Sequence, residues 1–455
     1  MYEDKEELAI TPDLIKTFSN EFKSDPVAQI SMNACWKCDP IDICLKREKL
    51  YETNHVFTHK VESEGKPVTH QKSTGRCWIF ASLNAMRIPF MKSLNIEEFE
   101  FSQAYLFFWD KIERCNYFLN KIVECIRKNE EIEGRLISYL LKEPTCDGGQ
   151  WDMIVNLITK YGVMPKKCFL ESYSAENSLR LNRILETKLR EYTRDIYELL
   201  AEEDEGQASE VVSLLQKQMK EVFRIVSICL GIPPENFTWE YYDKSKNYHS
   251  VGPVSPLEFY EKHVCLVNDP RPKNEYSKTF TVDCLGNMVN GRVIIYNNQP
   301  IEVLMKYAAE SIKSGEAVWF GCEVSKRFAS KLGIQDIDVH DYKSVFGVDI
   351  NMNLSKADRL IYGDSLMTHA MTFTAVTFDD NGLPVKWRVE NSWGEDRGDK
   401  GYHVLTSVWF REFVFEIVVD KKHLPKEILD VFDIEPVILP AWDPMGALAK
   451  EANLR

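Results

Sequence analysis

Apolar residues recur at helical spacing in the first half of the chain and in short β-branched runs in the second half. Helical spacing begins at Cys77, in a helix that Pro89 is expected to bend or end, and returns over residues 101–165 around a loop at residues 144–149. From about residue 290 the pattern changes to strands, predicted at residues 293–296, 317–320, 369–378 and 385–390. These patterns predict an α+β fold in which a helical half and a sheet-rich half face each other across a cleft.

Residues 178–228 carry two apolar stripes with steps of three or four residues, separated by an acidic run at residues 202–205. Two amphipathic helices around a charged turn form a helical hairpin. Two interpretations stay open. The helices belong to the core, or they form a projecting arm whose apolar stripe needs a partner subunit. Near the C-terminus, three prolines within residues 436–444 predict an extended segment.

The composition is that of a globular protein with an acidic surface. Of 455 residues, 44% are apolar, which is enough to bury the core of one large or two ordinary domains. The net charge of −14 disfavours binding to nucleic acid or to an anionic membrane. No apolar stretch reaches the roughly 18 residues of a membrane span, and the N-terminus lacks the apolar region of a signal peptide. We therefore expect a cytoplasmic protein whose cysteines are mostly reduced.

Cys77 is the first candidate for chemistry because it begins a predicted helix. The positive end of the helix dipole stabilises a thiolate at that position. The side-chain amide of Gln71, which precedes Cys77 by six residues, can donate to a developing oxyanion beside the backbone N–H of Cys77. The alternative is a buried structural cysteine.

Two further segments add a histidine and an amide. His369 opens a strand-like apolar run, in which the alternative is a core histidine with a satisfied ring. Asn391 follows the predicted strand at residues 385–390 and can hydrogen-bond to that ring, while Trp393 shields the contact from water. The alternative for this segment is a plain turn.

Three separated segments resemble, in order and in internal spacing, those of the papain-like cysteine peptidases: Gln71…Gly75-Arg-Cys77-Trp78, His369-Ala370 and Asn391-Ser-Trp393-Gly394. The resemblance implies that Cys77 is the nucleophile and that His369 is its acid and base partner. It also implies that Asn391 orients the imidazole and that Gln71 donates to the oxyanion. Gly148 and Gly149 resemble the glycine loop of that family, where backbone groups pair with an extended peptide substrate.

The sequence departs from the secreted members of that family at two places. Those enzymes carry a cysteine three residues before the nucleophile, bonded to the cysteine of the glycine loop; here that position is Thr74, so Cys146 lacks this partner. A reducing compartment accounts for the loss. Cys77 and His369 are 292 residues apart, against roughly 130–150 in papain-like enzymes. The difference implies a large insertion between the halves, and the predicted hairpin lies within it.

One branch of the family shares more of the sequence, over residues 75–80, 147–153, 389–396 and the tail at 441–449. The resemblance to this branch implies a cytosolic homohexamer that acts on peptides with a free N-terminus and on an amide bond of bleomycin. It also implies that the C-terminal tail, with Ala449, lies in the cleft and restricts cleavage to N-terminal residues. Residues 450–455 would then cross the thiol, so we expect self-processing in this stretch.

These patterns divide the chain into five segments. They are an N-terminal extension (1–64), a helical lobe carrying the nucleophile (65–177), the hairpin as an oligomerisation arm (178–228), the remaining helical insertion with the sheet-rich lobe that carries His369 and Asn391 (229–420), and the tail (421–455). The run His263-Val264-Cys265 lacks a short segment that the resemblance leads us to expect.

No other motif predicts a second chemistry. Cys35-x-x-Cys38 has no second pair, so we expect no metal site. No phosphate-binding loop, HExxH motif or dinucleotide fingerprint is present, so we expect no cofactor. Two rival functions stay open: a catalytically silent barrel scaffold, including one that binds nucleic acid, and a papain-like endopeptidase whose cleft admits internal peptide segments.

Overall fold

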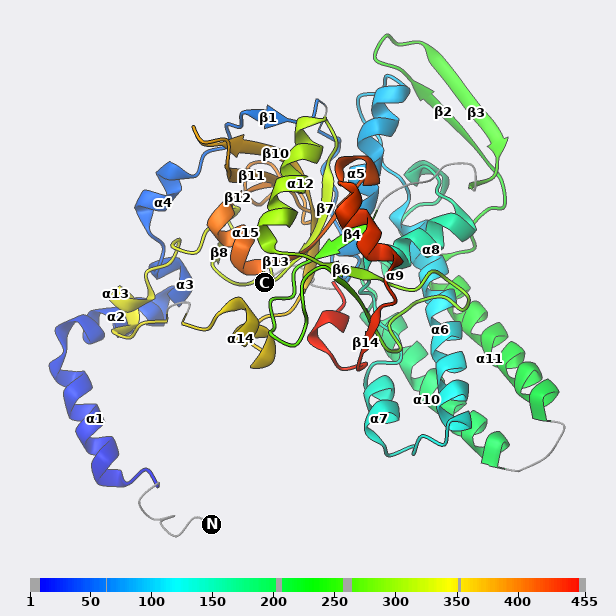
Figure 1. Cartoon of the computed structure of the whole chain (residues 1–455), viewed down its shortest axis with the longest axis horizontal. Helices are drawn as coiled ribbons and strands as arrows, with labels where there is room; N and C mark the ends of the chain where they lie inside the picture. The colour runs from blue at the N-terminus through cyan, green and yellow to red at the C-terminus, as the bar shows by residue number, and fades with distance from the viewer. Residues whose placement is uncertain (1–8, 63, 202–206, 257–263, 351–352, 450–455) are drawn as a thin grey trace.

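The computed structural model describes residues 9–62, 64–201, 207–256, 264–350 and 353–449. Figure 1 shows a helical lobe around the long helix α6 (Gln103–Arg127) beside a lobe built on a large sheet. Helix α1 (Pro12–Ser24) reaches away from both lobes. The predicted acidic turn, the residue His263 and the stretch expected to be self-processed lie outside the described residues.

The described helices lie mostly in the first half of the chain. Their bounds, beyond those of α1 and α6, are α2 Pro26–Lys37, α3 Pro40–Ile43, α4 Arg47–Glu52, α5 Cys77–Ser93, α7 Arg135–Lys142, α8 Trp151–Tyr161, α9 Tyr173–Glu176, α10 Leu179–Ala201, α11 Gln207–Leu230, α12 Ile301–Lys313, α13 Tyr342–Phe346, α14 Lys356–Ile361, α15 Ser407–Phe413 and α16 Lys426–Leu429. Short 3₁₀ turns lie at Lys166–Cys168, Lys421–His423, Asp430–Asp433 and Pro444–Gly446.

The described strands lie mostly in the second half. Their bounds are β1 His59–Lys60, β2 Phe237–Tyr242, β3 Tyr248–Val254, β4 Val264–Val267, β5 Lys278–Val282, β6 Tyr296–Asn298, β7 Val318–Cys322, β8 Phe328–Ala329, β9 Ile334–Gln335, β10 His369–Phe378, β11 Pro384–Glu390, β12 Tyr402–Thr406, β13 Val414–Val419 and β14 Val437–Leu439. The large sheet runs in the order β14-β5-β6-β4-β13-β7-β10-β11-β12-β9-β8, with β1 paired to β10, and β2 and β3 form a separate pair.

The sheet lobe is centred on strands that the alternating pattern predicts. Strand β10 has the predicted bounds His369–Phe378, and it pairs antiparallel with β7 and β11. The rings of Phe320 and Phe373 stack across β7 and β10 with centroids 3.7 Å apart. Helices α12 and α15 cover this face of the sheet, where Phe410 stacks on Phe373. Burial of these rings holds the central strands in register.

The hairpin α10–α11 packs against α6 within the same chain. The first apolar stripe is buried there, including Leu185, Leu189 and Ile196. Each such side chain contributes about 1.5–3 kcal/mol when it is removed from water. The apolar stripe of α10 therefore belongs to the core of the chain, which was one of the two interpretations. A role of the hairpin in assembly stays a prediction.

Pro89 was expected to bend or end the helix, and α5 continues through it to Ser93, so the second of these alternatives was wrong. Pro89 lacks an N–H and disturbs a helix interior by about 3 kcal/mol. Ile88 and Met91, on either side of it, are buried in the core. Their burial offsets that cost.

Two other segments differ from the expected pattern. The strand predicted at residues 293–296 is shifted to β6, because the side chains of Asn297 and Asn298 are fully buried and satisfied by backbone carbonyls. Residues after α11 form the β2–β3 hairpin where further helix was expected. Leu439 of the proline-rich segment lies in the short extended strand β14, and a 3₁₀ turn follows at Pro444–Gly446.

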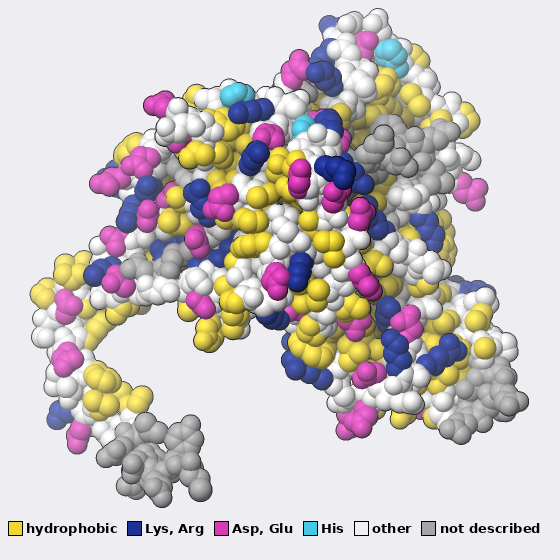
Figure 2. Space-filling view, in the orientation of Figure 1, with side chains coloured by type: hydrophobic (Ala, Val, Ile, Leu, Met, Phe, Trp, Pro, Cys, Tyr) yellow, Lys and Arg dark blue, Asp and Glu magenta, His cyan; other side chains and the backbone are white. Residues whose placement is uncertain are grey.

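The N-terminal arm presents apolar side chains to solvent. No residue of α1 or α2 is classed as buried, although both helices carry large apolar residues. Phe18 is 50% exposed, Ile30 70% and Trp36 80%. Figure 2 shows apolar groups along this arm, which stands away from the body of the molecule.

Candidate active site

Cys77 is the first residue of α5, where the sequence predicts a helix start. The side chain is fully buried at the junction of the lobes. Arg76 before it is also buried and pairs with Glu171 at 2.9 Å, which fixes the loop that leads into the helix. The first N–H groups of a helix have no acceptor within it, so the N–H of Cys77 makes no hydrogen bond within α5.

His369 and Asn391 are brought together by neighbouring strands. His369 begins β10, and Asn391 directly follows β11, which pairs with β10. The ring Nε2 of His369 lies 2.8 Å from Oδ1 of Asn391, and the same oxygen accepts from the backbone N–H of Ser392 at 2.8 Å. Trp393 covers the histidine ring with centroids 4.9 Å apart.

Helix α5 lies against the strand that carries His369. Thr372 of β10 donates its hydroxyl to the carbonyl of Ala81 at 3.0 Å, one turn beyond Cys77. Cys322 is the cross-strand partner of His369. Burial raises the pKa of the Cys322 thiol, and the neighbouring Cys77 sulfur adds to this shift. These contacts place the sulfur of Cys77 and the start of β10 in one region between the lobes.

Gln71 is fully buried and is held by hydrogen bonds to Thr74 and Ser392. Its Nε2 donates to the carbonyl of Thr74 at 2.7 Å, and its Oε1 accepts from the hydroxyl of Ser392 at 2.6 Å. Its backbone N–H donates to the carbonyl of Ser392 at 2.8 Å. The amide is therefore fixed between the loop before Cys77 and the segment that carries Asn391.

Asp147 joins the glycine loop to the nucleophile loop. Its carboxylate accepts from the N–H of Gly75 at 3.1 Å, from Lys111 at 2.8 Å and from the hydroxyl of Ser178. Burial alone would raise the pKa of Asp147, but Lys111 and the hydrogen bonds to the carboxylate lower it overall. Its backbone carbonyl accepts from the indole of Trp78 at 2.7 Å.

The C-terminal tail lies on the glycine loop, as the resemblance implies. The N–H of Gly149 donates to the carbonyl of Ala449 at 3.1 Å, and these two residues form an antiparallel bridge. Gln150 donates its amide to the carbonyl of Ala447 at 2.6 Å. A side chain at Gly149 would meet the ring of Trp78 at 2.4 Å, so the close approach requires glycine. Gly148 and Ala449 are buried at this contact.

Buried charges anchor the tail farther from the glycine loop. Asp443 pairs with Arg271 at 2.5 Å and with Lys273 at 3.1 Å, and Arg271 also pairs with Asp269 at 2.7 Å. Burial tends to raise the pKa of Asp443, but the hydrogen bond from Arg271 keeps it below its usual range. The tail is therefore held by ion pairs as well as by backbone contacts.

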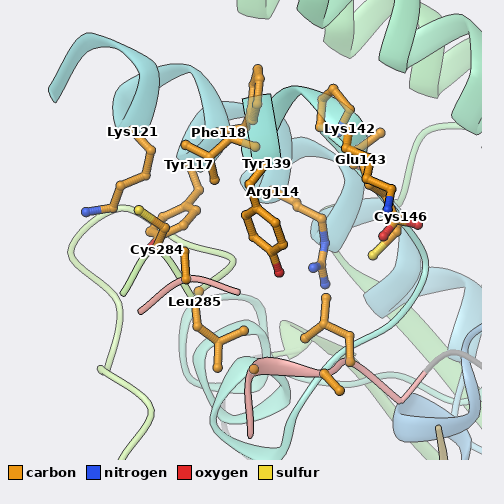
Figure 3. Close-up of a pocket in the computed structure, with 18 of the residues that line it drawn as sticks. Arg114, Tyr117, Phe118, Lys121, Tyr139, Lys142, Glu143, Cys146, Cys284 and Leu285 are labelled. Carbon is orange, nitrogen blue, oxygen red and sulfur yellow. The ribbon is translucent and has the colours of Figure 1, made fainter. Parts of the chain in front are cut away.

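A cavity of about 650 Å³ opens beside the tail. Arg114 and Tyr117 of α6 form one wall, and the tail residues Ala447 and Leu448 form another. Figure 3 shows side chains from α6, from the loop after α7 and from Cys284-Leu285 directed around this space. Thr368, which precedes His369, also lines it, so the cavity adjoins the candidate site.

The described part of the chain was compared with two further kinds of site, a metal-binding cluster and a membrane-spanning helix. Within those ranges, no group of three or more histidine, cysteine or acidic side chains is arranged to hold a metal ion. No helix within them is both long enough and apolar enough to cross a membrane.

Sequence reasoning named Cys77, His369, Asn391, Gln71, Gly148, Gly149, Trp393 and Ala449, and the structure places all of them around this region. It missed the anchoring roles of Asp147 and Ser392. Ser392 lies between Asn391 and Trp393, and Asp147 directly precedes Gly148, so both are next to predicted site residues in the sequence. Their burial and their partners depend on the tertiary structure.

Comparisons with known proteins point to one family. The model of the Peptidase C1-like family matches residues 9–446. A mouse protein named bleomycin hydrolase is 56% identical over 448 residues, which cover 96% of this chain and 98% of its own length. The human protein of the same name is 55% identical over 442 residues, with 94% and 96% covered. Cysteine proteinase 1, mitochondrial, of Saccharomyces cerevisiae strain S288c is 41% identical over 454 residues, with 96% and 92% covered.

One solved structure agrees with the sequence comparisons. The crystal structure of PepW from Lactobacillus rhamnosis is similar with a TM-score of 0.92 and 37% identity, and the match covers 97% of this chain and 99% of that one. The papain-like α+β fold predicted from the sequence is thereby confirmed. Because the family model and these relatives span nearly the whole chain, the protein belongs to the Peptidase C1-like family and is a cysteine peptidase.

Proposed function

We propose that the protein is a cysteine aminopeptidase that cleaves the first amide bond of substrates with a free N-terminus. Cys77 is the nucleophile, and His369 is the general acid and base. Asn391 holds the imidazole in place, and Gln71 with the N–H of Cys77 stabilises the oxyanion. The hydrogen bonds that fix His369 and Gln71 on either side of Asn391-Ser392 support these roles.

The reaction proceeds in two steps. The Cys77 thiolate attacks the carbonyl of the first amide, and His369 protonates the leaving amine as the C–N bond breaks. Water then attacks the thioester, with His369 as base, and the freed acid leaves the regenerated thiol. Trp393, whose ring is tilted against that of His369, keeps bulk water from the imidazole.

The observation that carries the restriction to N-terminal residues is the bridge between Ala449 and Gly149. Extended peptides pair with an exposed backbone edge through their own backbone groups. Here the tail of the chain already occupies that edge, and its anchor at Asp443 holds it there. A substrate can then place only its first residue on this side of the thiol, with the rest of the peptide on the other side.

The substrate class includes peptides with a free N-terminus, and we extend it to bleomycin. Support for bleomycin comes from the names of the mouse and human relatives, whose similarity covers nearly the full length. Gly148 and Gly149 would contact the backbone of these substrates, and Trp393 would lie beside the leaving group.

We also propose a cytoplasmic homohexamer. The exposed apolar face of α1 and α2 supports self-association, because contiguous apolar surface on an otherwise charged protein marks an interaction site. The α10–α11 hairpin is a second candidate contact. Sedimentation of the full chain and of a variant with Phe18→Ser and Trp36→Ser tests the contact through α1 and α2. If the variant still forms a hexamer, these two helices do not make the assembly contact.

The decisive experiment compares two fluorogenic peptides that differ only in an N-terminal acetyl group. We expect cleavage of the free-amine peptide and at least about 10²-fold slower cleavage of the acetylated one, a difference of about 2.7 kcal/mol in the transition state. Equal rates would identify an endopeptidase. If neither peptide is cleaved and iodoacetamide labels no single fast-reacting thiol, the chain is a silent scaffold.

A further inference from the structure

A buried ion pair joins the helix of the candidate nucleophile to the strand that leads to Asn391. Arg87 lies in α5, the helix that Cys77 begins, and Glu390 is the last residue of β11, directly before Asn391. Nη2 of Arg87 lies 2.5 Å from Oε1 of Glu390, and both side chains are buried. Neither side chain is an acid, a base or a nucleophile of the proposed reaction.

The guanidinium of Arg87 also binds the loop that precedes the nucleophile. Its Nη1 donates to the carbonyl of Pro67 at 2.8 Å and to the carbonyl of Phe99 at 3.1 Å. Its Nη2 donates to the carbonyl of Gly65 at 3.1 Å. A Cβ at residue 65 would overlap the guanidinium, so this close approach requires glycine. One side chain therefore connects α5, two loop segments of the helical lobe and the end of β11.

Glu390 lies on the face of the sheet that contacts α5. It is the cross-strand partner of Thr372 in β10, and the side chains of such partners lie on the same face of a sheet. The hydroxyl of Thr372 donates to the carbonyl of Ala81 in α5 at 3.0 Å. The sheet is thus tied to this helix at Ala81 and again at Arg87. The position of α5 along these strands sets how far the sulfur of the nucleophile lies from the imidazole.

The ion pair is poorly suited to a purely stabilising role. Nε of Arg87 and Oε2 of Glu390 are buried and have no hydrogen-bond partner among the residues that the structure describes. Burial raises the pKa of Glu390, and Arg87 acts against this shift. Removing two charges from water costs much of what their attraction returns, so apolar side chains often replace such pairs without loss of stability. Charged hydrogen bonds of fixed geometry do, however, define the relative position of the segments that they join.

We propose that Arg87 and Glu390 are positioning residues, whose ion pair aligns the nucleophile with the imidazole and the amide of the candidate site. The proposal rests on the proposed function, because it takes the roles of those three groups from it. The pair acts through the helix that carries the sulfur and through the strand end that carries the amide. A misplacement of about 1 Å, even one caused far from the chemistry, lowers a rate by about 10²-fold.

The test uses full-length variants and the fluorogenic peptide with a free amine. Arg87→Lys keeps the charge but loses the planar fork that reaches the carbonyls, and Arg87→Met loses both. We expect kcat to fall by about 10²-fold in Arg87→Met and by about 10-fold in Arg87→Lys. KM should change by less than about twofold, because neither variant removes a contact with the substrate.

A second measurement reports on the alignment without a substrate. Iodoacetamide alkylates Cys77 through the thiolate that the neighbouring imidazole stabilises, and peptide mass mapping follows the modification of this residue. Alkylation at neutral pH should be fastest in the parent protein, slower in Arg87→Lys and slowest in Arg87→Met.

A double variant separates alignment from stability. In Arg87→Met with Glu390→Met no charge of the pair stays buried, so urea unfolding should show that stability lost in Arg87→Met is largely regained. We expect kcat to stay low, because the ion pair is still absent. A double variant that regains the kcat of the parent protein together with its stability would overturn the proposal. Arg87→Lys and the double variant decide the question if Arg87→Met does not fold.

Arg359→Met is the matched control. Arg359 is also buried, pairs with Glu412 at 2.5 Å and donates to the carbonyl of Leu354 at 2.6 Å, and these partners lie outside the candidate site. This variant should lose stability and keep the kcat of the parent protein. An equal loss of kcat in Arg359→Met, or an unchanged kcat in both single variants of Arg87, would overturn the proposal.

The outcomes for the proposed function are distinct from these. If the parent protein does not cleave the free-amine peptide, the proposed function fails, and the alkylation rates still decide the alignment. Equal alkylation of Cys77 in the parent protein and in the Arg87 variants would then overturn the positioning role.

Discussion

The orientation of a single imidazole follows from hydrogen bonds around one amide. Oδ1 of Asn391 accepts from the backbone N–H of Ser392, so the atom facing the ring of His369 is an oxygen. An amide oxygen only accepts, so Nε2 of His369 carries a proton and donates it to Asn391. In the proposed reaction, the other ring nitrogen, Nδ1, is then the atom that exchanges protons with the substrate.

Replacing Asn391 with Ala should slow turnover without unfolding the protein. The ring of His369 would lose the acceptor that fixes its tautomer, and a misplacement near 1 Å costs about 10²-fold in rate. We expect kcat to fall by about that factor while KM changes little, as steady-state kinetics will measure. Asn381→Ala, in an exposed turn, is the matched control and should keep the rate of the parent protein. An unchanged kcat in Asn391→Ala would contradict the role of Asn391.

Replacing Cys77 with Ala should remove turnover and keep the fold. The side chain loses only its sulfur, whereas the covalent intermediate can no longer form, so we expect kcat to fall by at least about 10³-fold. Circular dichroism checks that the fold is retained, and steady-state kinetics measure the loss of turnover. Cys38→Ala, at an exposed thiol, should behave like the parent protein. Substantial residual hydrolysis in Cys77→Ala would mean that another group is the nucleophile.

At the scale of elements, the site depends on how loops are tied to helices. Asp147 connects the glycine loop to Gly75 of the nucleophile loop and to Lys111 of α6. Lys111 is fully buried and also donates to the carbonyl of Cys146 at 2.8 Å. A buried ion pair of this kind positions three segments at once, and removal of one partner leaves the other charge uncompensated.

The variant Asp147→Asn should therefore be destabilised by about 3–5 kcal/mol. The amide keeps the shape of the side chain but leaves Lys111 charged and buried. Chemical denaturation measures the loss, and Asp380→Asn, in an exposed turn, should show none. A second substitution, Lys111→Met, should restore part of the stability in the Asp147→Asn background. A double variant less stable than the single one would contradict this account of the pair.

The same carboxylate makes stability depend on pH in the acid range. The pKa of Asp147 lies below its unfolded value of about 3.9 because Lys111 and its hydrogen bonds outweigh burial. The contribution of this carboxylate to the free energy of unfolding is therefore complete at pH values above the unfolded pKa. It is lost as the pH falls through the lower pKa of the folded protein. We expect the free energy of unfolding of the parent protein to drop more steeply between about pH 4 and pH 2 than that of Asp147→Asn. Parallel curves for the two proteins would contradict the lowered pKa.

The sequence predicted elements best where the local pattern decides the structure. Strand β10 and the start of α5 at Cys77 matched, because alternation and a helix start are local signals. Pro89 within α5 and the buried asparagines of β6 did not, because tertiary burial overrides local preference there. The candidate site could be assembled from its motifs by resemblance. The hydrogen bonds of Asp147 and Ser392 could not be predicted, because they join segments that are far apart in the sequence.

At the scale of the whole molecule, we propose that the tail restricts which substrates can enter. Replacing Asp443 with Ala should loosen the tail, because Arg271 would lose its 2.5 Å partner and Lys273 its 3.1 Å partner. We expect the acetylated peptide to be cleaved faster relative to the free-amine peptide, as the ratio of their kcat/KM values will show. Asp433→Ala lies in the same terminal segment but is exposed, and it should keep the ratio of the parent protein. A ratio that Asp443→Ala leaves unchanged would mean that the tail does not limit access.

The pairing of β14 with β5 has a consequence for shortened forms of the chain. β14 is the terminal strand of the large sheet, and it covers the hydrogen-bonding groups of β5 through residues Val437–Leu439. A chain cut after Ala449 keeps this cover, whereas a chain cut before Val437 uncovers β5. Bare edges of that kind recruit strands from neighbouring molecules. The shorter form should therefore aggregate, so the terminal segment protects solubility as well as lying on the glycine loop.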